Sequence, residues 1–382
     1  MYSLDGYGSM VADRVRVDAY AEALRKTVRA GSVVVEIGTG PGVFAVLACQ
    51  LGASHVYAIE PSEIIQVARE IAAANGYTDK IEFIEQFSNQ VTLPTRAEVI
   101  VSDLRGVLPL LERHIPAIVD ARRRFLAPGG TLIARKDTLW AAIAEAPKPY
   151  GELVDPWDHN AFGQDLSPAR RLIVNHVQKV SVDADRLLTV GRLWTTLDYN
   201  RVENPDVRGN LEWRVERGGT GHGLVVWFDA DLVDGIGFSN APSGRETVYG
   251  SLFFPWPQPV PLVPCQSVAV SLEAKLLEED YVWRWSTRIE PPDGSGVPAI
   301  HFEQSQLAGE VLSRAKLHRR AATYVPRLSE EGRLRRRALE LMDGRASLEH
   351  IARQLTTEFP QRFSKWEQAL SYAGAVSEKY SR

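Results

Sequence analysis

The sequence predicts a chain of three parts: an α/β domain with a parallel sheet, an antiparallel β-barrel or sandwich, and a small helical appendage. Three observations predict this order. Short apolar runs alternate with helical stretches up to about residue 146, alternating runs broken by prolines follow, and the final stretch has only helical spacing. We therefore expect domains at 1–146, 147–324 and 325–382.

In the first part, short apolar runs alternate with helices. The runs predicted as strands are 33–37, 55–60, 81–85, 97–103 and 129–135. The run VVVEI is almost wholly apolar, which indicates burial on both faces, as in a parallel sheet. The stretches 43–52 and 62–76 have helical spacing and end at a glycine, the usual residue after a helix. This alternation predicts a doubly wound, Rossmann-like fold.

The middle part has the pattern of an antiparallel sheet. Alternating runs are 187–194, 223–232, 267–276 and 281–289. Seven of the nine tryptophans lie in this part, which favours a thick apolar core over an exposed binding face. Trp283 and Trp285 are two residues apart, so on a strand they share one face, and we expect both in the core.

The last part is predicted to hold three helices. The first ends at Gly344, the second covers 348–359 with Ser347 as its N-cap, and the third begins with Ser364 as its N-cap. The RLRRR run at 333–337 is predicted to be a solvated helix face. The segment is loosely similar to the helical half of PqqD-type peptide-binding domains, but the hairpin of that fold is not evident.

Composition excludes several classes of protein. A net charge of -4 and a pI near 6.1 provide no overall basic field that would attract nucleic acid. The two cysteines, Cys49 and Cys265, support neither a disulfide framework nor a thiolate metal site. The histidines have no metal-ligand spacing, so no metal is expected. The start lacks the pattern of a leader peptide and no long apolar run occurs, so we expect a cytoplasmic protein and no membrane partner.

A glycine-rich turn follows the first predicted strand. The segment from Glu36 through Gly38, Thr39, Gly40 and Gly42 leads directly into a helix. Glycines allow positive φ and a close approach of the backbone to a ligand, and the helix N-terminus adds unpaired N–H groups. The spacing E-x-G-x-G-x-G differs from the dinucleotide form G-x-G-x-x-G and suits S-adenosylmethionine better, although a dinucleotide enzyme stays an alternative.

Further cofactor contacts are expected at the ends of the next strands. Glu60 ends the second strand, where a carboxylate accepts both ribose hydroxyls in such folds. Ser88 and Asn89 follow the third strand, where the adenine edge is read, although polar residues are also common in such loops. Glu36 is expected to order the amino end of the cofactor through the loop.

Two acids bracket the loop after the fourth strand. Asp103 stands at the end of the strand and Glu112 nine residues later. Here the sequence resembles a divergent bacterial member of the protein arginine N-methyltransferase family, whose double-acid loop has two glutamates at this spacing. The resemblance covers about residues 2–320. It implies Asp103 and Glu112 as catalytic residues, Met10 and Arg16 as cofactor contacts on an N-terminal lid helix, and Tyr2 or Tyr7 as an aromatic lid over the substrate.

The same resemblance implies a dimerisation arm starting near 162–167, and hence a head-to-tail homodimer. Two departures from the family pattern stand out. The Thr-His-Trp loop is Thr247-Val248-Tyr249 here, which places Tyr249 beside the substrate and removes a histidine. Asp103 is one methylene shorter than glutamate, which leaves a gap of about 1.5 Å to the acceptor.

Paired acids suit a guanidino acceptor. A guanidinium is cationic and a poor nucleophile, and two carboxylates can hold it bidentately and draw its charge away from the reacting nitrogen. We expect Glu112 to be the dominant anchor and Asp103 the assistant, with arginine, an arginine peptide or an arginine-like small molecule as acceptor. Two alternatives stay open: methylation of a hydroxyl, carboxylate or amine with either acid as general base, and a non-catalytic cofactor-binding partner.

Overall fold

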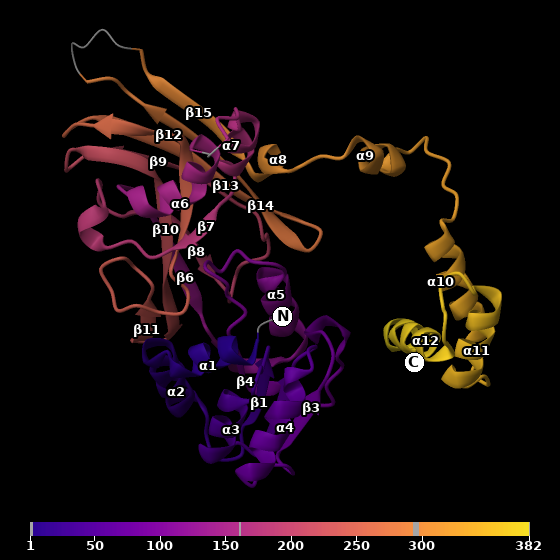
Figure 1. The fold of residues 1–382 in the computed structure, drawn as a ribbon. Coiled ribbons are helices and arrows are strands. Elements are labelled where there is room, and N and C mark those ends of the chain that lie inside the picture. Colours follow the sequence, from indigo (N-terminus) through magenta and orange to yellow (C-terminus); the bar gives the residue numbers. More distant parts are fainter. Residues whose placement is uncertain (1–2, 160–161, 293–297, 382) are drawn as a thin grey trace. The chain divides into compact units, whose positions relative to one another are not determined.

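The computed structural model describes residues 3–159, 162–292 and 298–381 (Figure 1). The chain forms two compact units, Met1–Glu310 and Val311–Arg382. The first unit contains the parallel sheet and the antiparallel sheets, and the second is helical. The predicted domain bounds at 146 and 324 stay predictions.

A five-stranded parallel sheet forms the first half of unit 1. Its order, β3-β2-β1-β4-β5, is that of a doubly wound fold. The predicted strands are confirmed with small shifts at their ends. They are β1 (Val33–Ile37), β2 (His55–Ile59), β3 (Ile81–Ile84), β4 (Ala97–Ser102) and β5 (Leu126–Ile133). Val34 and Val35 of the central strand are fully buried, as the apolar run predicts.

Helices complete this half. They are α1 (Leu4–Ala12), α2 (Arg14–Thr27), α3 (Val43–Gln50), α4 (Ile64–Ala74) and α5 (His114–Arg124). A short 3-10 helix, η1 (Ser88–Gln90), follows β3. Asp13 caps α2, because its side chain accepts a hydrogen bond from the backbone N–H of Arg16. The cap therefore fixes where the N-terminal helices bend, beside the ends of β1 and β4.

The antiparallel part consists of two sheets. One has the order β7-β12-β10-β6-β8, with β11 paired to β10, and the other β15-β14-β13-β9. The antiparallel part starts at Lys136, earlier than residue 147, because β6 pairs with the long strand β10. Trp283 and Trp285 are buried, as predicted. The bounds are β6 (Lys136–Ala144), β7 (Gln178–Val180), β8 (Arg192–Asp198), β9 (Val207–Arg214), β10 (Gly219–Val233), β11 (Ile236–Ser239), β12 (Ser251–Leu262), β13 (Ser267–Leu277), β14 (Asp280–Ile289) and β15 (Ile300–Ser305), with a 3-10 turn η2 (Ala184–Arg186).

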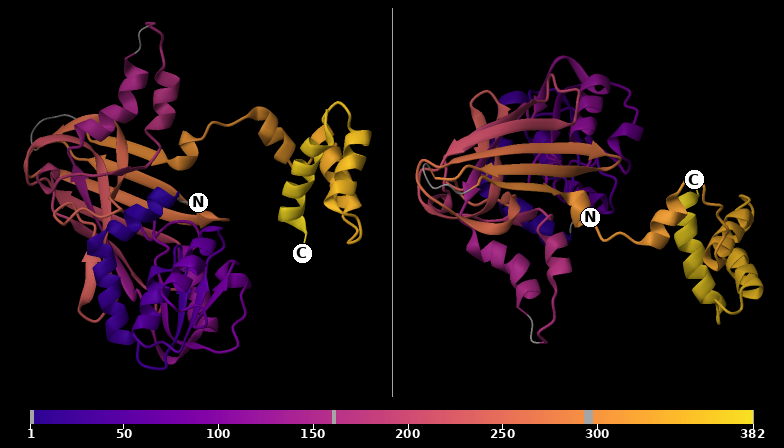
Figure 2. Two further views of the ribbon diagram at one scale, coloured as in Figure 1. Left: turned by 60° about the horizontal axis from the view of Figure 1, so that its bottom comes forward. Right: turned by 90° about the horizontal axis from the view of Figure 1, so that it is seen from above.

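A helical hairpin projects from the antiparallel part, in magenta in Figure 2. Its two helices are α6 (Pro147–Asp158) and α7 (Ser167–Ile173). Arg170 joins them through an ion pair with Asp158 at 2.7 Å, and its Nη1 donates to the carbonyl of Pro257 on β12 at 2.7 Å. The hairpin is thus bonded to the barrel through Arg170, and it includes the segment in which the resemblance implies the start of a dimerisation arm.

Unit 2 has a small core of its own. The short helix α8 (Gln306–Gly309) ends unit 1, and α9 (Arg314–Arg320), α10 (Glu330–Leu341), α11 (Leu348–Glu358) and α12 (Trp366–Tyr380) belong to unit 2. Leu334, Ile351 and Leu355 are buried in this core. No strand occurs in the described part of unit 2 (311–381), so the chain lacks a PqqD-type hairpin there.

One of the two N-caps predicted in unit 2 is confirmed. The Ser347 side chain accepts from the backbone N–H of His350 at the start of α11. The prediction for Ser364 is wrong, because the N-cap of α12 is the next residue, Lys365. The Gln368 side chain folds back and accepts a hydrogen bond from the backbone N–H of Ser364. In the described residues, no helix combines the length and the apolar character needed to cross a membrane.

Candidate functional site

The predicted site residues gather at the carboxyl ends of the parallel strands. The glycine turn follows β1, Glu60 follows β2, the pair Ser88 and Asn89 follows β3, and Asp103 follows β4. Parallel strands place these ends at one edge of the sheet, where ligands bind in doubly wound folds. The fold therefore brings together segments that are far apart in sequence.

The glycine turn needs glycine at each of its three positions. Gly38, Gly40 and Gly42 all have positive φ, at 72°, 51° and 79°. At Gly40 there is also no room for a side chain, because a Cβ would lie 2.9 Å from Cε1 of Tyr7. Tyr7 of α1 thus lies against the turn. Its predicted role as a lid over the substrate stays a prediction, and Tyr2 lies outside the described residues.

Glu36 is a buried acid that holds the turn from beneath. Its Oε2 accepts a hydrogen bond from the Thr39 hydroxyl at 2.5 Å. Burial raises the pKa of Glu36 to about 8, and the hydrogen bond from Thr39 offsets only part of that rise. A cationic amino group placed beside Glu36 would lower this pKa again, because a nearby positive charge favours the ionised form.

The Glu60 carboxylate faces the same turn. Its Oε2 accepts from the backbone N–H of Gly40 at 3.1 Å, and its Oε1 accepts from the backbone N–H and the hydroxyl of Ser62 at 3.1 and 2.6 Å. The carboxylate is therefore fixed at the end of β2, in the position predicted for a ribose contact.

The two residues predicted to read the adenine differ in exposure. Ser88 is buried at the start of η1, and its carbonyl accepts from Nη2 of Arg124 at 2.7 Å. Asn89 is exposed. The exposed ring of Phe87 precedes them. Ser88 therefore has a structural role in holding η1 to α5, and the adenine contact of the pair stays a prediction.

Arg16 pairs with the first acid of the loop. Its Nη1 lies 2.6 Å from Oδ2 of Asp103, and its Nη2 donates to the carbonyl of Met10 at 2.9 Å. Its Nε is buried and has no hydrogen-bond partner among the described residues. Such an orphaned donor needs an acceptor, which fits a carboxylate ligand arriving beside α2.

Asp103 is already surrounded by donors. The Tyr249 hydroxyl lies 2.8 and 2.6 Å from its two oxygens, and Nη1 of Arg105 donates to Oδ1 at 3.2 Å. Burial alone would raise the pKa of Asp103, but the charges of Arg16 and Arg105 outweigh burial and lower the pKa below its ordinary 3.8. Asp103 is thus ionised, and its charge is balanced within the protein.

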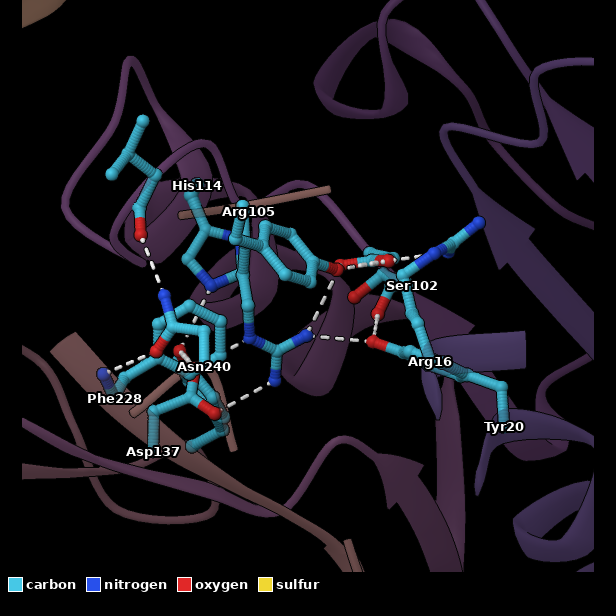
Figure 3. Close-up of polar contacts among 12 residues, drawn as sticks. Arg16, Tyr20, Ser102, Arg105, His114, Asp137, Phe228 and Asn240 are labelled. Carbon is cyan, nitrogen blue, oxygen red and sulfur yellow. Dashed lines mark hydrogen bonds and ion pairs between the residues drawn. The ribbon is translucent and has the colours of Figure 1, made fainter. Parts of the chain in front are cut away.

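A buried polar chain extends from Asp103 into the barrel, and Figure 3 labels Tyr20, Arg105, His114 and Asp137 among its members. Arg105 forms two hydrogen bonds to Asp137 of β6, at 2.7 and 2.8 Å, and a third to the Tyr20 hydroxyl at 2.6 Å. The Tyr199 hydroxyl donates to Asp137 at 2.5 Å and contacts Nε2 of His114 at 3.0 Å. Burial lowers the pKa of His114 to about 3, so this ring is neutral.

Beyond Asp103, the members of this chain were not predicted from the sequence. One signal was present: Asp137 occupies an inward position of a strand whose other inward residues are apolar, and it is fully buried. A lone acid at such a position requires a cationic partner. The partner, Arg105, lies between the two predicted acids in the sequence, but its separation from Asp137 along the chain does not predict that the two side chains pair.

Glu112 differs from Asp103 in its surroundings. Its side chain is exposed, and its backbone has a positive φ of 43°. The backbone N–H donates to Oδ1 of Asp280 on β14 at 3.1 Å, which ties the loop to the barrel. Among the described residues, none bonds to the Glu112 carboxylate. The structure thus leaves one acid of the loop available and one engaged.

The Thr247-Val248-Tyr249 segment joins the barrel to the N-terminal helices. The backbone N–H of Val248 donates to Oδ2 of Asp13, the N-cap of α2, at 2.9 Å. Tyr249 stacks on Phe238 with ring centroids 5.8 Å apart. The ring is thereby held with its hydroxyl toward Asp103, and its predicted contact with the substrate stays a prediction.

Two family profiles match the chain. Residues 20–142 match a profile described as ribosomal protein L11 methyltransferase, and residues 135–278 match one described as the arginine methyltransferase oligomerization subdomain. Together they cover the parallel sheet and most of the barrel with its hairpin. Unit 2 lies outside both matches.

Curated relatives are arginine methyltransferases by name. The chain is 29% identical to probable protein arginine N-methyltransferase 6 of Arabidopsis thaliana, over 63% of this chain and 57% of that protein. It is 27% identical to probable protein arginine N-methyltransferase 1.2 of the same plant, over 64% and 71%, and 32% identical to probable histone-arginine methyltransferase CARM1 of Oryza sativa, over 58% and 44%. The chain thus spans 44% to 71% of the length of these relatives.

Solved structures agree on the fold. The enzyme-prozyme complex of Trypanosoma brucei PRMT1 with AdoHcy superposes with a TM-score of 0.71, at 19% identity over 78% of this chain and 97% of that chain. Protein arginine methyltransferase 10 of Arabidopsis thaliana superposes with a TM-score of 0.69, at 21% identity over 79% and 97%. The predicted Rossmann-like domain followed by a barrel is therefore confirmed.

Proposed function

We infer that this chain is a member of the protein arginine N-methyltransferase family and transfers the sulfonium methyl group of S-adenosylmethionine to a guanidino nitrogen of arginine. The observation that carries this inference is the geometry at the sheet edge: a glycine turn flanked by two buried acids lies beside a loop with one engaged acid and one available acid. The replacement of the first acid by Asp103 makes the chain a divergent member.

The residues at the turn fit the cofactor. The fixed Glu60 carboxylate suits a ribose diol, and the buried Glu36 carboxyl suits an amino group. Arg16 has an orphaned Nε for a carboxylate. Met10 and Tyr7 of α1 lie beside these residues, since the Met10 carbonyl accepts a hydrogen bond from Arg16 and the Tyr7 ring lies against Gly40.

The two acids divide the work of holding the acceptor. Asp103 has its charge balanced by Arg16 and Arg105, so it contributes an oriented acceptor atom rather than a free charge. Glu112 has no cationic partner among the described residues, so it is the acid that neutralises an incoming guanidinium. Hydrogen bonds from the cation to a carboxylate are strong and directional, and they leave the opposite nitrogen free to react. The proton lost on methylation leaves from that nitrogen to solvent.

The substitution Glu112→Gln tests this role. We expect methyl transfer to an arginine peptide to fall by a factor on the order of 100 or more, because the amide removes the charge that holds the guanidinium. Affinity for S-adenosylmethionine, measured by calorimetry, should stay unchanged, since Glu112 is remote from the glycine turn in sequence and in its contacts. The matched control is Glu279→Gln, an exposed acid near the same loop, which should leave turnover intact.

Three results would count against the proposal. Near-normal turnover of Glu112→Gln would remove Glu112 as the anchor. A methylated product without a guanidine, identified by mass spectrometry after incubation with arginine, arginine peptides and a metabolite mixture, would favour a hydroxyl, carboxylate or amine acceptor. Cofactor binding without formation of S-adenosylhomocysteine on any of these acceptors would favour a non-catalytic partner.

We also propose that the chain forms a homodimer through the hairpin of α6 and α7. The match of residues 135–278 to an oligomerization subdomain supports this assembly, because it includes the whole hairpin. The exposed ring of Phe162 near the hairpin tip supports it as well. Such a ring is costly in water and suits an interface.

A further inference from the structure

Arg105 is a buried guanidinium in the loop between the two acids. Its side chain is 0% exposed, although the neighbouring loop residues Leu104, Val107 and Leu108 are apolar and would pack at less cost. Burying a charge is unfavourable unless it is paired and hydrogen-bonded. Its presence there therefore calls for an explanation beyond packing.

The hydrogen bonds of Arg105 connect Asp137 of strand β6 to Asp103. Its Nε and Nη2 bond to the two oxygens of Asp137, which clamps one edge of the planar group. Its Nη1 bonds to the Tyr20 hydroxyl and reaches Oδ1 of Asp103 at 3.2 Å. A guanidinium clamped at one edge presents its remaining N–H groups at fixed positions, so strand β6 determines where the donor beside Asp103 lies.

We propose that Arg105 is a positioning residue that keeps Asp103 ionised and oriented toward the acceptor, with Asp137 as the clamp that fixes Arg105. This inference rests on the proposed function, because it assigns Asp103 to the acceptor site. Arg105 supplies a permanent cation on Oδ1. The charge of Asp103 therefore does not depend on Arg16 alone, and Arg16 is the residue expected to bind the cofactor.

The charged and titratable groups around Asp103 determine its pKa. The titratable and charged groups around it in the described residues are Arg16 and Tyr20 of α2, Arg105 of the loop, His114 of α5, Asp137 of β6, Tyr199 after β8 and Tyr249 before β12. His114 is neutral, and the pKa values of the three tyrosines are raised, so all four are uncharged at neutral pH. Among the residues that the structure describes, Arg16 and Arg105 alone oppose the protonation of Asp103 with a positive charge.

The test compares the unsubstituted protein with its Arg105→Met variant. The carboxyl carbon of Asp103 is followed by NMR against pH in protein labelled at aspartate, and it is assigned by its loss in Asp103→Asn. We expect the titration of Asp103 to move up by about one pH unit or more in Arg105→Met, because one opposite charge is removed. Arg105→Lys should reverse most of the shift, and the acidic limb of the pH–rate profile should move in step.

Arg122→Met is the matched control. Arg122 is also largely buried and bonds to the carbonyls of Tyr199 and Val202, but it does not touch Asp103, so its loss should leave the titration in place. Arg105→Met leaves the buried Asp137 carboxylate without its cationic partner, which can destabilise the fold. The double variant Arg105→Met with Asp137→Asn removes both charges and keeps a hydrogen-bond acceptor for the Tyr199 hydroxyl.

Two outcomes would overturn the proposal. One is an unchanged Asp103 titration in whichever charge-removing variant folds. The other is loss of folding in both charge-removing variants while Arg105→Lys folds, which would mark a structural ion pair. The NMR titration does not require methyl transfer. If no arginine substrate is methylated, that result counts against the proposed function, whereas the Asp103 titration still tests the role of Arg105.

Discussion

Glu36 shows how strongly position changes the chemistry of one side chain. The sequence places it before a glycine turn, and the fold buries it to 3% exposure. Its pKa rises to about 8, chiefly because burial penalises the carboxylate. Glu112, by contrast, has an exposed side chain. Two glutamates of one sequence therefore have very different surroundings in the folded protein.

Glu36 should make stability depend on pH. Because its pKa is raised above the ordinary 4.5, the folded state keeps a proton that the unfolded state loses between about pH 4.5 and about pH 8. Stability from this group is present below pH 4.5 and is lost as pH rises through 8. We expect Glu36→Gln, which cannot ionise, to gain on the wild type by up to a few kcal/mol over this range.

Urea unfolding of both proteins without cofactor, at intervals from pH 5 to pH 8.5, measures this difference. Only the difference between the two proteins is informative, because other groups titrate in both. A constant difference across the range would show that Glu36 is ionised in the folded state. Glu98→Gln, in which the exposed side chain still accepts from the backbone N–H of Val33, is the matched control for replacing a carboxylate by an amide.

Helices and strands followed from local patterns where those patterns were complete. The apolar run at 33–37 became β1 with the predicted ends, because a strand buried on both faces tolerates only apolar side chains. Strand β5 starts at Leu126, earlier than the predicted residue 129, since its pairing with β4 extends past the glycines. The end of an element is thus determined by its partner, and the partner is not adjacent in sequence.

The two serines of unit 2 provide a test of capping. Ser347→Ala removes the acceptor for the His350 N–H, so we expect α11 to lose about 1 kcal/mol of stability. Ser364→Ala should have a smaller effect, because Ser364 is not the N-cap of α12. Hydrogen exchange of the α11 amides measures both. Equal loss of protection in the two variants would contradict the assignment of the caps.

The chain joins a site-bearing unit to a helical unit with a separate core. The core of unit 2 is built from its own helices, α10, α11 and α12, and the family matches end before it begins. The hairpin of α6 and α7 belongs to unit 1 and is held to the barrel by Arg170. Assembly is therefore expected to depend on unit 1, where the hairpin lies.

The proposed dimer can be tested at the hairpin tip. Phe162 is 84% exposed, and we expect Phe162→Asp to weaken self-association at least tenfold, because a charge replaces an aromatic ring at an apolar interface. Sedimentation velocity over a concentration series measures this change. Val263→Asp, a substitution at an exposed apolar residue outside the hairpin, is the control. A wild-type protein that stays monomeric at high concentration would refute the dimer.

The sequence alone was enough for the class of fold, the glycine turn and the acids at the strand ends. These features depend on local rules: burial of apolar runs, positive φ at glycine, and the common edge of parallel strands. The partners of Asp103 were not predictable in this way. Its partners lie 87, 2 and 146 residues away in the sequence, at Arg16, Arg105 and Tyr249. Asp137, which fixes Arg105, lies on β6 of the antiparallel part. Charges in a buried site interact through space, so their balance exists only once the two halves of unit 1 have packed together.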